Sequence, residues 1–355
     1  MKKYILALLF IMGCFTASFG QAIGSWKAYP ALQISTYNVA NGNKIYSLCN
    51  GNLFSYDTET TEVHVYDRLN GLHDSKISFL RFCKTTNKVV LIYENGNVDL
   101  IYPDDEVVNM KQLKDKNYPN LILNNVVENG QKMYLCTNFG MMVIDTDKEV
   151  FEGTYDLELN VNGCALVGQY IYLACSTGLY RGLSSDNLLD KNNWTKVNGS
   201  IFYELVYFKD ELIGYNPWGL YKIDLTTFRN PPFFQKNLSF FSYNNDCLIA
   251  GNKSHLYIFS TTTEQKDVAI DNTFQYVNLH KGTYWMSQGL NGLQPYQLKN
   301  NELTPTLSAL QPNSPVRDYF CNMHYVGTRL LVAGGDQNYN DLVRPGTVMF
   351  YEDGV

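Results

Sequence analysis

The sequence has few charged residues and few of the residue types that most often carry chemistry. Charged residues make up 17% of the 355 residues, below the roughly 25% of an average soluble domain. There are five histidines, and none stands in an H-x-H or H-E-x-x-H spacing that would indicate zinc. No P-loop and no G-x-S-x-G nucleophile elbow occur. We therefore predict no catalytic residue, no metal ligand and no cofactor, and we expect a protein that is not an enzyme.

Positive charge and long apolar runs are also scarce. Lys and Arg number 28 against 34 Asp and Glu, which gives a formal net charge of −6. A chain without a basic stripe lacks the electrostatic footprint of a nucleic-acid-binding protein. Hydrophobic residues make up 45% of the chain, too many for a disordered protein. No segment is long enough to span a bilayer as a helix, so we expect no transmembrane segment in the mature chain.

The N-terminal residues read as an export signal. Lys2 and Lys3 precede an apolar run from Tyr4 to Phe15, and Ser18-Phe19-Gly20 has the small-x-small pattern that signal peptidase accepts. We predict a signal peptide at 1–20 and a mature domain at 21–355, exported to the periplasm or the outer cell surface. The alternative is a lipoprotein, because Ile11-Met12-Gly13-Cys14 resembles a lipobox in which Cys14 is lipidated.

Paired-cysteine motifs are absent. Eight cysteines occur, and without Cys14 seven remain, an odd number. No C-x-x-C pair is present, which argues against a zinc ribbon or a thioredoxin-like motif. The cysteines stand within apolar runs such as Tyr134-Leu135-Cys136, where a free thiol behaves as a small buried hydrophobe. We expect mostly free, buried thiols, although exported proteins often carry disulfides.

Aromatic residues are abundant, and one unit recurs along the chain. Aromatics reach 14%, with 27 Tyr and 19 Phe, a bias that favours sheet. Residues 44–57, 88–101 and 132–145 each read as a strand, a polar turn containing Gly or Asn, and a second strand, which is a hairpin signature. Further copies begin near Tyr170, Leu212, Leu248, Tyr284 and Leu330. The repeat of about 40 residues matches one four-stranded propeller blade.

The predicted fold is all-β: a β-propeller of seven to eight four-stranded blades, closed by an N-terminal strand. Residues 36–40 and 77–82 read as inner strands, and 62–66 as an outer one. The strand-like segment 24–29 has no blade of its own. We expect it to pair with the last unit, 315–351, and so to close the ring. A pair of β-sandwiches is the rival fold, but it would not require a fixed period.

Three groups of side chains have some features of ligand sites. Residues 336–341 place oxygen ligands at alternate positions, as calcium loops do, but lack Gly at the sixth place and Glu at the twelfth. A polar surface loop explains them better, and a solvated acidic loop likewise explains residues 104–106. Trp194, Trp218 and Trp285 could stack on sugars at loop rims, but aromatics in propellers more often pack between blades.

Four stretches resemble the N-terminal propeller region of the PorZ family, accessory proteins of the type IX secretion system of Bacteroidota. These are Gly24-Ser25-Trp26, Asn70 to Ser78, Tyr93 to Ile101 and Arg344 to Tyr351. A weaker resemblance, through the Asn70-Gly71-Leu72 turn, links the chain to the sensor propellers of hybrid two-component regulators.

The resemblance implies an exported, non-enzymatic binding scaffold for type IX secretion and cell-surface attachment. Its expected partners are proteins of a surface secretion and attachment complex, or a surface glycan such as anionic lipopolysaccharide. The family has no catalytic motif to transfer. Its members continue into a second propeller and a C-terminal domain beyond the length of this sequence. The alternatives are a periplasmic glycan-sensing propeller and a propeller glycan hydrolase or lyase.

Export leads to a first test. We predict cleavage after Gly20, so that the mature protein begins at Gln21, because the small residues before Gln21 suit signal peptidase. Intact mass of the protein recovered from the periplasm or surface measures this directly. A diacylglyceryl mass on Cys14 would show instead that the protein is a lipoprotein.

Overall fold

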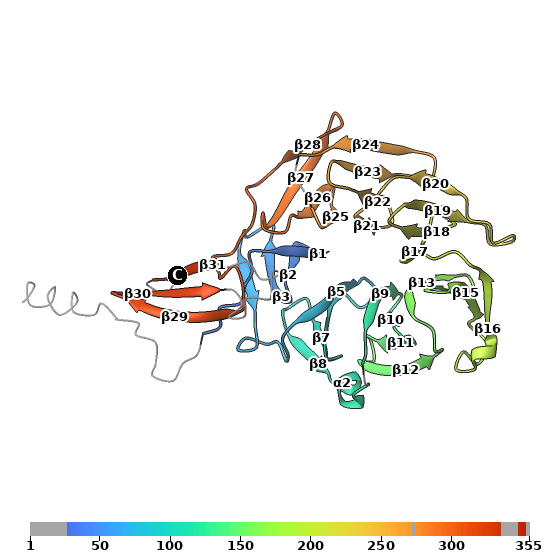
Figure 1. Cartoon of the computed structure of the whole chain (residues 1–355), viewed down its shortest axis with the longest axis horizontal. Helices are drawn as coiled ribbons and strands as arrows, with labels where there is room; N and C mark the ends of the chain where they lie inside the picture. Colours follow the sequence, from blue (N-terminus) through green and yellow to red (C-terminus); the bar gives the residue numbers. More distant parts are fainter. Residues whose placement is uncertain (1–26, 119, 272–273, 335–346, 353–355) are drawn as a thin grey trace, which may run out of the picture.

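Consecutive strands pair with one another in eight antiparallel sheets, A to H (Figure 1). The computed structural model describes residues 27–118, 120–271, 274–334 and 347–352. The signal peptide, its cleavage site, Cys14 and residues 336–341 lie outside these ranges. Seven of the described sheets have four strands and the eighth has three, which confirms the predicted all-β propeller.

The first two sheets are A (β1 Ser35–Asn41, β2 Lys44–Cys49, β3 Asn52–Asp57, β4 Val63–Tyr66) and B (β5 Ile77–Cys83, β6 Lys88–Tyr93, β7 Val98–Ile101, β8 Val107–Met110). Sheets C and D follow: C (β9 Leu123–Asn129, β10 Lys132–Thr137, β11 Gly140–Asp145, β12 Val150–Asp156) and D (β13 Val161–Val167, β14 Tyr170–Cys175, β15 Gly178–Leu183, β16 Trp194–Asn198). Next are E (β17 Glu204–Phe208, β18 Glu211–Asn216, β19 Gly219–Ile223, β20 Pro232–Gln235) and F (β21 Phe240–Tyr243, β22 Leu248–Gly251, β23 His255–Phe259, β24 Gln265–Ala269). The last are G (β25 Tyr276–His280, β26 Thr283–Ser287, β27 Leu293–Lys299, β28 Glu302–Pro305) and H (β29 Phe320–Val326, β30 Arg329–Gly334, β31 Thr347–Tyr351).

Helices are short in the described part of the chain. They are α2 (Gln112–Lys116), of five residues, and the 3-10 helix η1 (Lys191–Asn193), of three. None of the described helices has the length and apolar character that crossing a membrane requires.

Burial follows the position of each strand within its sheet. The second strand of a sheet has a neighbouring blade against each of its two faces and is therefore buried on both, as in β6, where all six residues are buried. This explains their continuous apolar sequence, since alternation marks a strand with only one buried face. Fourth strands lie at the rim and are more exposed, as in β24, where only Val268 is buried.

Glycine begins the third strand of three consecutive sheets for a steric reason. Gly140 and Gly219 have φ angles of 155° and 158°. A Cβ at Gly140 would lie 2.0 Å from the Tyr155 carbonyl oxygen, and one at Gly219 would lie 2.2 Å from that of Phe234. The fourth strand therefore approaches the third so closely that only glycine fits. Gly178 of sheet D is similarly placed against Asn198.

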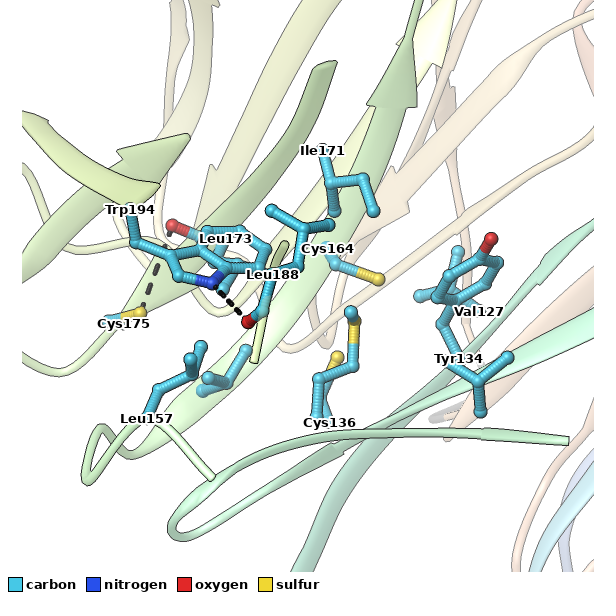
Figure 2. Packing of buried hydrophobic residues seen from close by; sticks show 13 residues of the cluster. Val127, Tyr134, Cys136, Leu157, Cys164, Ile171, Leu173, Cys175, Leu188 and Trp194 are labelled. Carbon is cyan, nitrogen blue, oxygen red and sulfur yellow. Dashed lines mark hydrogen bonds between the residues drawn. The ribbon is translucent and has the colours of Figure 1, made fainter. Parts of the chain in front are cut away.

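Apolar side chains fill the space between adjacent blades. Figure 2 shows the cluster between sheets C and D, where Cys136 and Cys164 meet among aliphatic residues. Trp194 packs in the same cluster and donates from Nε1 to the Leu188 carbonyl oxygen at 3.0 Å. Six described cysteines are buried and carry free thiols, as expected: Cys49, Cys83, Cys136, Cys164, Cys175 and Cys247.

The ring closes where sheet A meets sheet G. Ser35 and Gly289 form an isolated antiparallel bridge, with N–H···O distances of 3.1 and 2.8 Å. Leu32, Phe54 and Trp285 pack together in the apolar cluster between the two sheets.

The closure therefore differs in detail from the prediction. The N-terminal strand that closes the ring is β1, and it contacts β25 and β26 rather than the last unit. Residues 24–26 lie outside the described ranges, and residues 27–29 form no strand. The predicted pair of 24–29 and the last unit is therefore not what closes the ring, because sheets A and G each have four strands of their own and meet directly.

Sheet H lies beside the ring, which therefore has seven blades (Figure 1). Its described links to the ring are few. Asn52 donates to Asp318 at 2.9 Å, just before the sheet, and the Tyr29 and Tyr351 hydroxyls lie 2.6 Å apart. Sheet H exposes large apolar side chains, among them Phe350, which is 70% exposed. The eighth hairpin of the sequence repeat is thus a separate unit.

The closure contact yields a second prediction. Asn38 of β1 is fully buried and donates from Nδ2 to the Trp285 carbonyl oxygen at 3.2 Å and to Ser287 Oγ at 2.9 Å. Asn38→Leu keeps the branching of the side chain but replaces the amide with larger apolar groups and leaves these acceptors unpaired, so we expect a loss of about 1–3 kcal/mol in the free energy of unfolding. Urea denaturation measures this. The exposed loop residue Asn237 provides the control, Asn237→Leu, and an equal loss in both variants would contradict the assigned role.

Candidate binding cavity

A cavity of about 1250 Å³ lies within the ring. Its walls come from the first strands of every ring sheet except D, together with the turns that follow those strands. First strands line the ring interior, and most of them contact the first strands of neighbouring sheets, as β5 contacts β1 and β9. Clefts framed by rigid elements and lined with aromatic and convergent polar groups are where ligands most often bind.

Arg81, from β5, is the cationic side chain within the walls. Its guanidinium donates from Nε to the Val126 carbonyl oxygen at 2.8 Å and from Nη1 to the Leu80 carbonyl oxygen at 2.9 Å. The group also lies 4.8 Å from the Tyr37 ring centre and 5.4 Å from that of Phe79. These contacts fix the position of the guanidinium before any ligand arrives.

Asn125 connects Arg81 to a carboxyl group inside the ring. Arg81 Nη2 donates to Asn125 Oδ1 at 3.0 Å, and the Asn125 side chain hydrogen-bonds to Glu204 of β17. Three residues from three different sheets therefore form one polar row: Arg81 of B, Asn125 of C and Glu204 of E. Sheet D lies between sheets C and E, and its strand β13 carries Gly163 next to Glu204. A Cβ at this position would lie 3.1 Å from the Glu204 Cα, so the absence of a side chain lets β17 approach closely enough for Glu204 to join the row.

Burial controls the charge of Glu204. Desolvation raises the pKa of its carboxyl to about 7, against the lowering effects of Arg81 and Asn125. The carboxyl therefore changes its charge near neutral pH. Burial also raises the pKa of the nearby Tyr276 hydroxyl well above its usual value, so this hydroxyl remains neutral.

Tyrosines supply the aromatic walls. The rings of Tyr37 and Tyr276 lie 3.9 Å apart between centres, and Tyr37 donates to the Tyr276 hydroxyl at 3.1 Å. Tyr243 is 36% exposed although it lies inside the ring. Its hydroxyl has no hydrogen-bond partner among residues that the structure describes.

The mouth of the cavity carries both signs of charge. Lys84, Lys209 and Lys281 lie in the turns after β5, β17 and β25, and Glu128 and Asp246 lie beside them. Desolvation raises the pKa of Glu128 above its usual value. With three lysines against two carboxyl groups, the mouth is more positive than the net charge of −6 suggests.

The residues singled out from the sequence lie elsewhere. Trp194 and Trp285 are buried between blades, whereas Trp218 is 63% exposed on the β18–β19 turn. In the described ranges no group of three or more His, Cys, Asp or Glu side chains is placed to hold a metal. Sequence reasoning missed the cavity row, although one signal was available: Arg81 and Glu204 are charges within otherwise apolar inner-strand patterns.

The sequence and the fold of the chain were each compared with those of known proteins. Residues 45–195 match the family described as "TSS9, PorZ, N-terminal beta-propeller domain". A solved PorZ structure from Porphyromonas gingivalis superposes with a TM-score of 0.83 at 23% identity, over 93% of this chain and 45% of that chain. The chain resembles the N-terminal propeller of PorZ. It spans less than half of the PorZ chain that it matches.

More distant structures share only the propeller fold. The extracellular domain of the putative hybrid two-component system BT3049 from B. thetaiotaomicron gives a TM-score of 0.59 at 9% identity, covering 91% of this chain and 47% of that one. The computationally designed Ika8 protein gives 0.54 at 11% identity, covering 92% and 98%. No curated protein sequence matches the chain. PorZ is thus the resemblance that both the family match and the structural comparison support.

The shifted carboxyl gives a third prediction, on stability against pH. Free glutamate titrates near 4.5 and Glu204 near 7 in the fold. Between these values the unfolded chain releases a proton that the native state keeps, so native stability falls as pH rises from about 4.5 to 7. Glu204→Gln has no carboxyl to titrate and so does not lose this stability. Relative to wild type, we expect its free energy of unfolding to rise by on the order of 1–3 kcal/mol between pH 4.5 and pH 8.

Urea midpoints of both proteins across this pH range provide the measurement. Glu302→Gln, on the exposed strand β28, is the matched control and should follow wild type. Parallel curves for wild type and Glu204→Gln would contradict the raised pKa.

Proposed function

We propose that this protein is an exported, non-enzymatic binding propeller that acts as an accessory component of type IX secretion and cell-surface attachment. The observation that carries the proposal is the superposition on PorZ over 93% of the chain, and the family match at 45–195 agrees with it. The matched protein is described as an essential bacterial surface component of the type IX secretion system.

The architecture suits a role in binding. Seven blades form a rigid ring, and the turns between strands gather at its two rims. Loops held by a rigid scaffold are where binding residues concentrate. The expected partners are proteins of the surface secretion complex or a surface glycan, and the expected location is the periplasm or outer surface of a bacterium of the Bacteroidota. The signal peptide predicted at 1–20 supports that location.

The second candidate is a ligand-sensing propeller. The fold shared with the BT3049 extracellular domain favours it, and so does the polar cavity inside the ring. A sensor would respond to a ligand without affecting secretion, so a single genetic experiment separates the two functions.

That experiment is an in-frame deletion of the gene in its host, complemented with the wild-type gene. We expect the deletion to leave secreted cargo unprocessed and detached from the surface, because an accessory component is needed for attachment. Immunoblots of culture medium and surface fractions measure both effects. Normal cargo processing and attachment in the deletion strain, or a host without type IX machinery, would overturn the secretion role.

A further inference from the structure

We propose that the cavity inside the ring is a binding site for a small organic carboxylate, with the Arg81 guanidinium holding the carboxylate group. This goes beyond the proposed secretion role and does not rest on it, because the argument uses only the geometry of the cavity.

The first argument is the unused bonding capacity of Arg81. A guanidinium has five N–H donors, and the described residues use three of them, on the Val126 and Leu80 carbonyl oxygens and on Asn125 Oδ1. One N–H remains on each terminal nitrogen, which suits the two oxygens of a carboxylate. Arg81 forms no direct ion pair with a described carboxylate, and Glu204 is connected to it only through Asn125, so the two remaining N–H groups stay open to a ligand.

The second argument is that the guanidinium is held in place. Its backbone hydrogen bonds and its stacking on Tyr37 and Phe79 immobilise a side chain that otherwise loses considerable entropy on binding. Groups that are already positioned bind more tightly because less ordering is left to the ligand.

The sign of the ligand charge follows from the charged groups of the walls. A cationic ligand at this position would be repelled by Arg81. An anion gains from Arg81 and from the lysines at the mouth, of which Lys84 has one described side-chain partner, Asn245 Oδ1, at 3.4 Å. A positive entrance attracts anions even on a protein with a net charge of −6.

The organic body of the ligand follows from the aromatic walls. Tyr37, Tyr243 and Tyr276 present ring surface to the cavity, and such surfaces bind ring-shaped or apolar ligand parts by burial. Tyr243 also offers a hydroxyl without a described partner. An inorganic anion would bind through the guanidinium alone and would leave the tyrosine rings in contact with water.

Isothermal titration of the mature chain at pH 8 tests the proposal. The probes are benzoate and glucuronate, each with its neutral counterpart, benzamide and glucose, and inorganic phosphate. We expect at least one acid to bind with a Kd below 10 mM, roughly the limit of the method, and to bind at least tenfold more tightly than its neutral counterpart. Absence of binding by both acids, equal binding of acid and neutral probe, or phosphate binding as tightly as either acid would overturn the proposal.

Variants assign the binding to the cavity. Arg81→Gln should weaken binding by about tenfold or more, since it removes the charge. Because Arg81 also bonds the backbone, Tyr243→Phe serves as a milder test, and we expect a loss of about threefold. Lys266→Gln, on the exposed outer strand β24, is the control and should bind as wild type. Unchanged binding in folded Arg81→Gln or in Tyr243→Phe would overturn the assignment.

Glu204→Gln provides a change of opposite sign. At pH 8 the Glu204 carboxyl is ionised and repels a bound carboxylate nearby, so its removal should tighten binding by about threefold or more. If the row of Arg81, Asn125 and Glu204 served only to hold the cavity in shape, each substitution in it would weaken binding. Weaker binding by Glu204→Gln would therefore contradict the proposal.

Discussion

The contact between the first and seventh blades is the interaction on which the rest of the structure depends. Strand β1 meets sheet G through the Ser35–Gly289 bridge, the Asn38 amide and the contact between the Tyr37 and Tyr276 rings. Each blade buries its faces against two neighbours, so an open ring would leave sheets A and G with one uncovered apolar face each. The same contact brings Tyr37 and Tyr276 to the cavity wall, so closure and the candidate site share residues.

The periodic part of the fold could be predicted from the sequence. Hairpins at 44–57 and 132–145 were recognisable because strand and turn chemistry are local, and the structure places β2–β3 and β10–β11 there. The blade count and the closure partner could not be predicted, because they depend on pairings between distant segments. The repeat near Leu330 looks like the others, yet it belongs to sheet H beside the ring.

The cavity was harder to predict for a related reason. Arg81, Asn125 and Glu204 lie on three sheets and come together only when the ring has formed. The local sequence marks Arg81 and Glu204 as charges in apolar strands but does not show that they share a row, whose formation also requires Gly163 on a fourth sheet. The resemblance to PorZ does not identify the row either, since at 23% identity it shows the fold alone.

Ring closure also has a kinetic consequence. Asn38 and Trp285 are 247 residues apart in sequence, and closing a loop of that length costs about 5 kcal/mol of chain entropy. The closing contact cannot form until the intervening blades are in place, so it belongs to the late part of folding. Until then the chain presents the apolar face of sheet A to solvent, a state that favours association between chains over completion of one ring. Dilution during refolding should therefore matter more for this protein than for a domain of equal size built from local contacts.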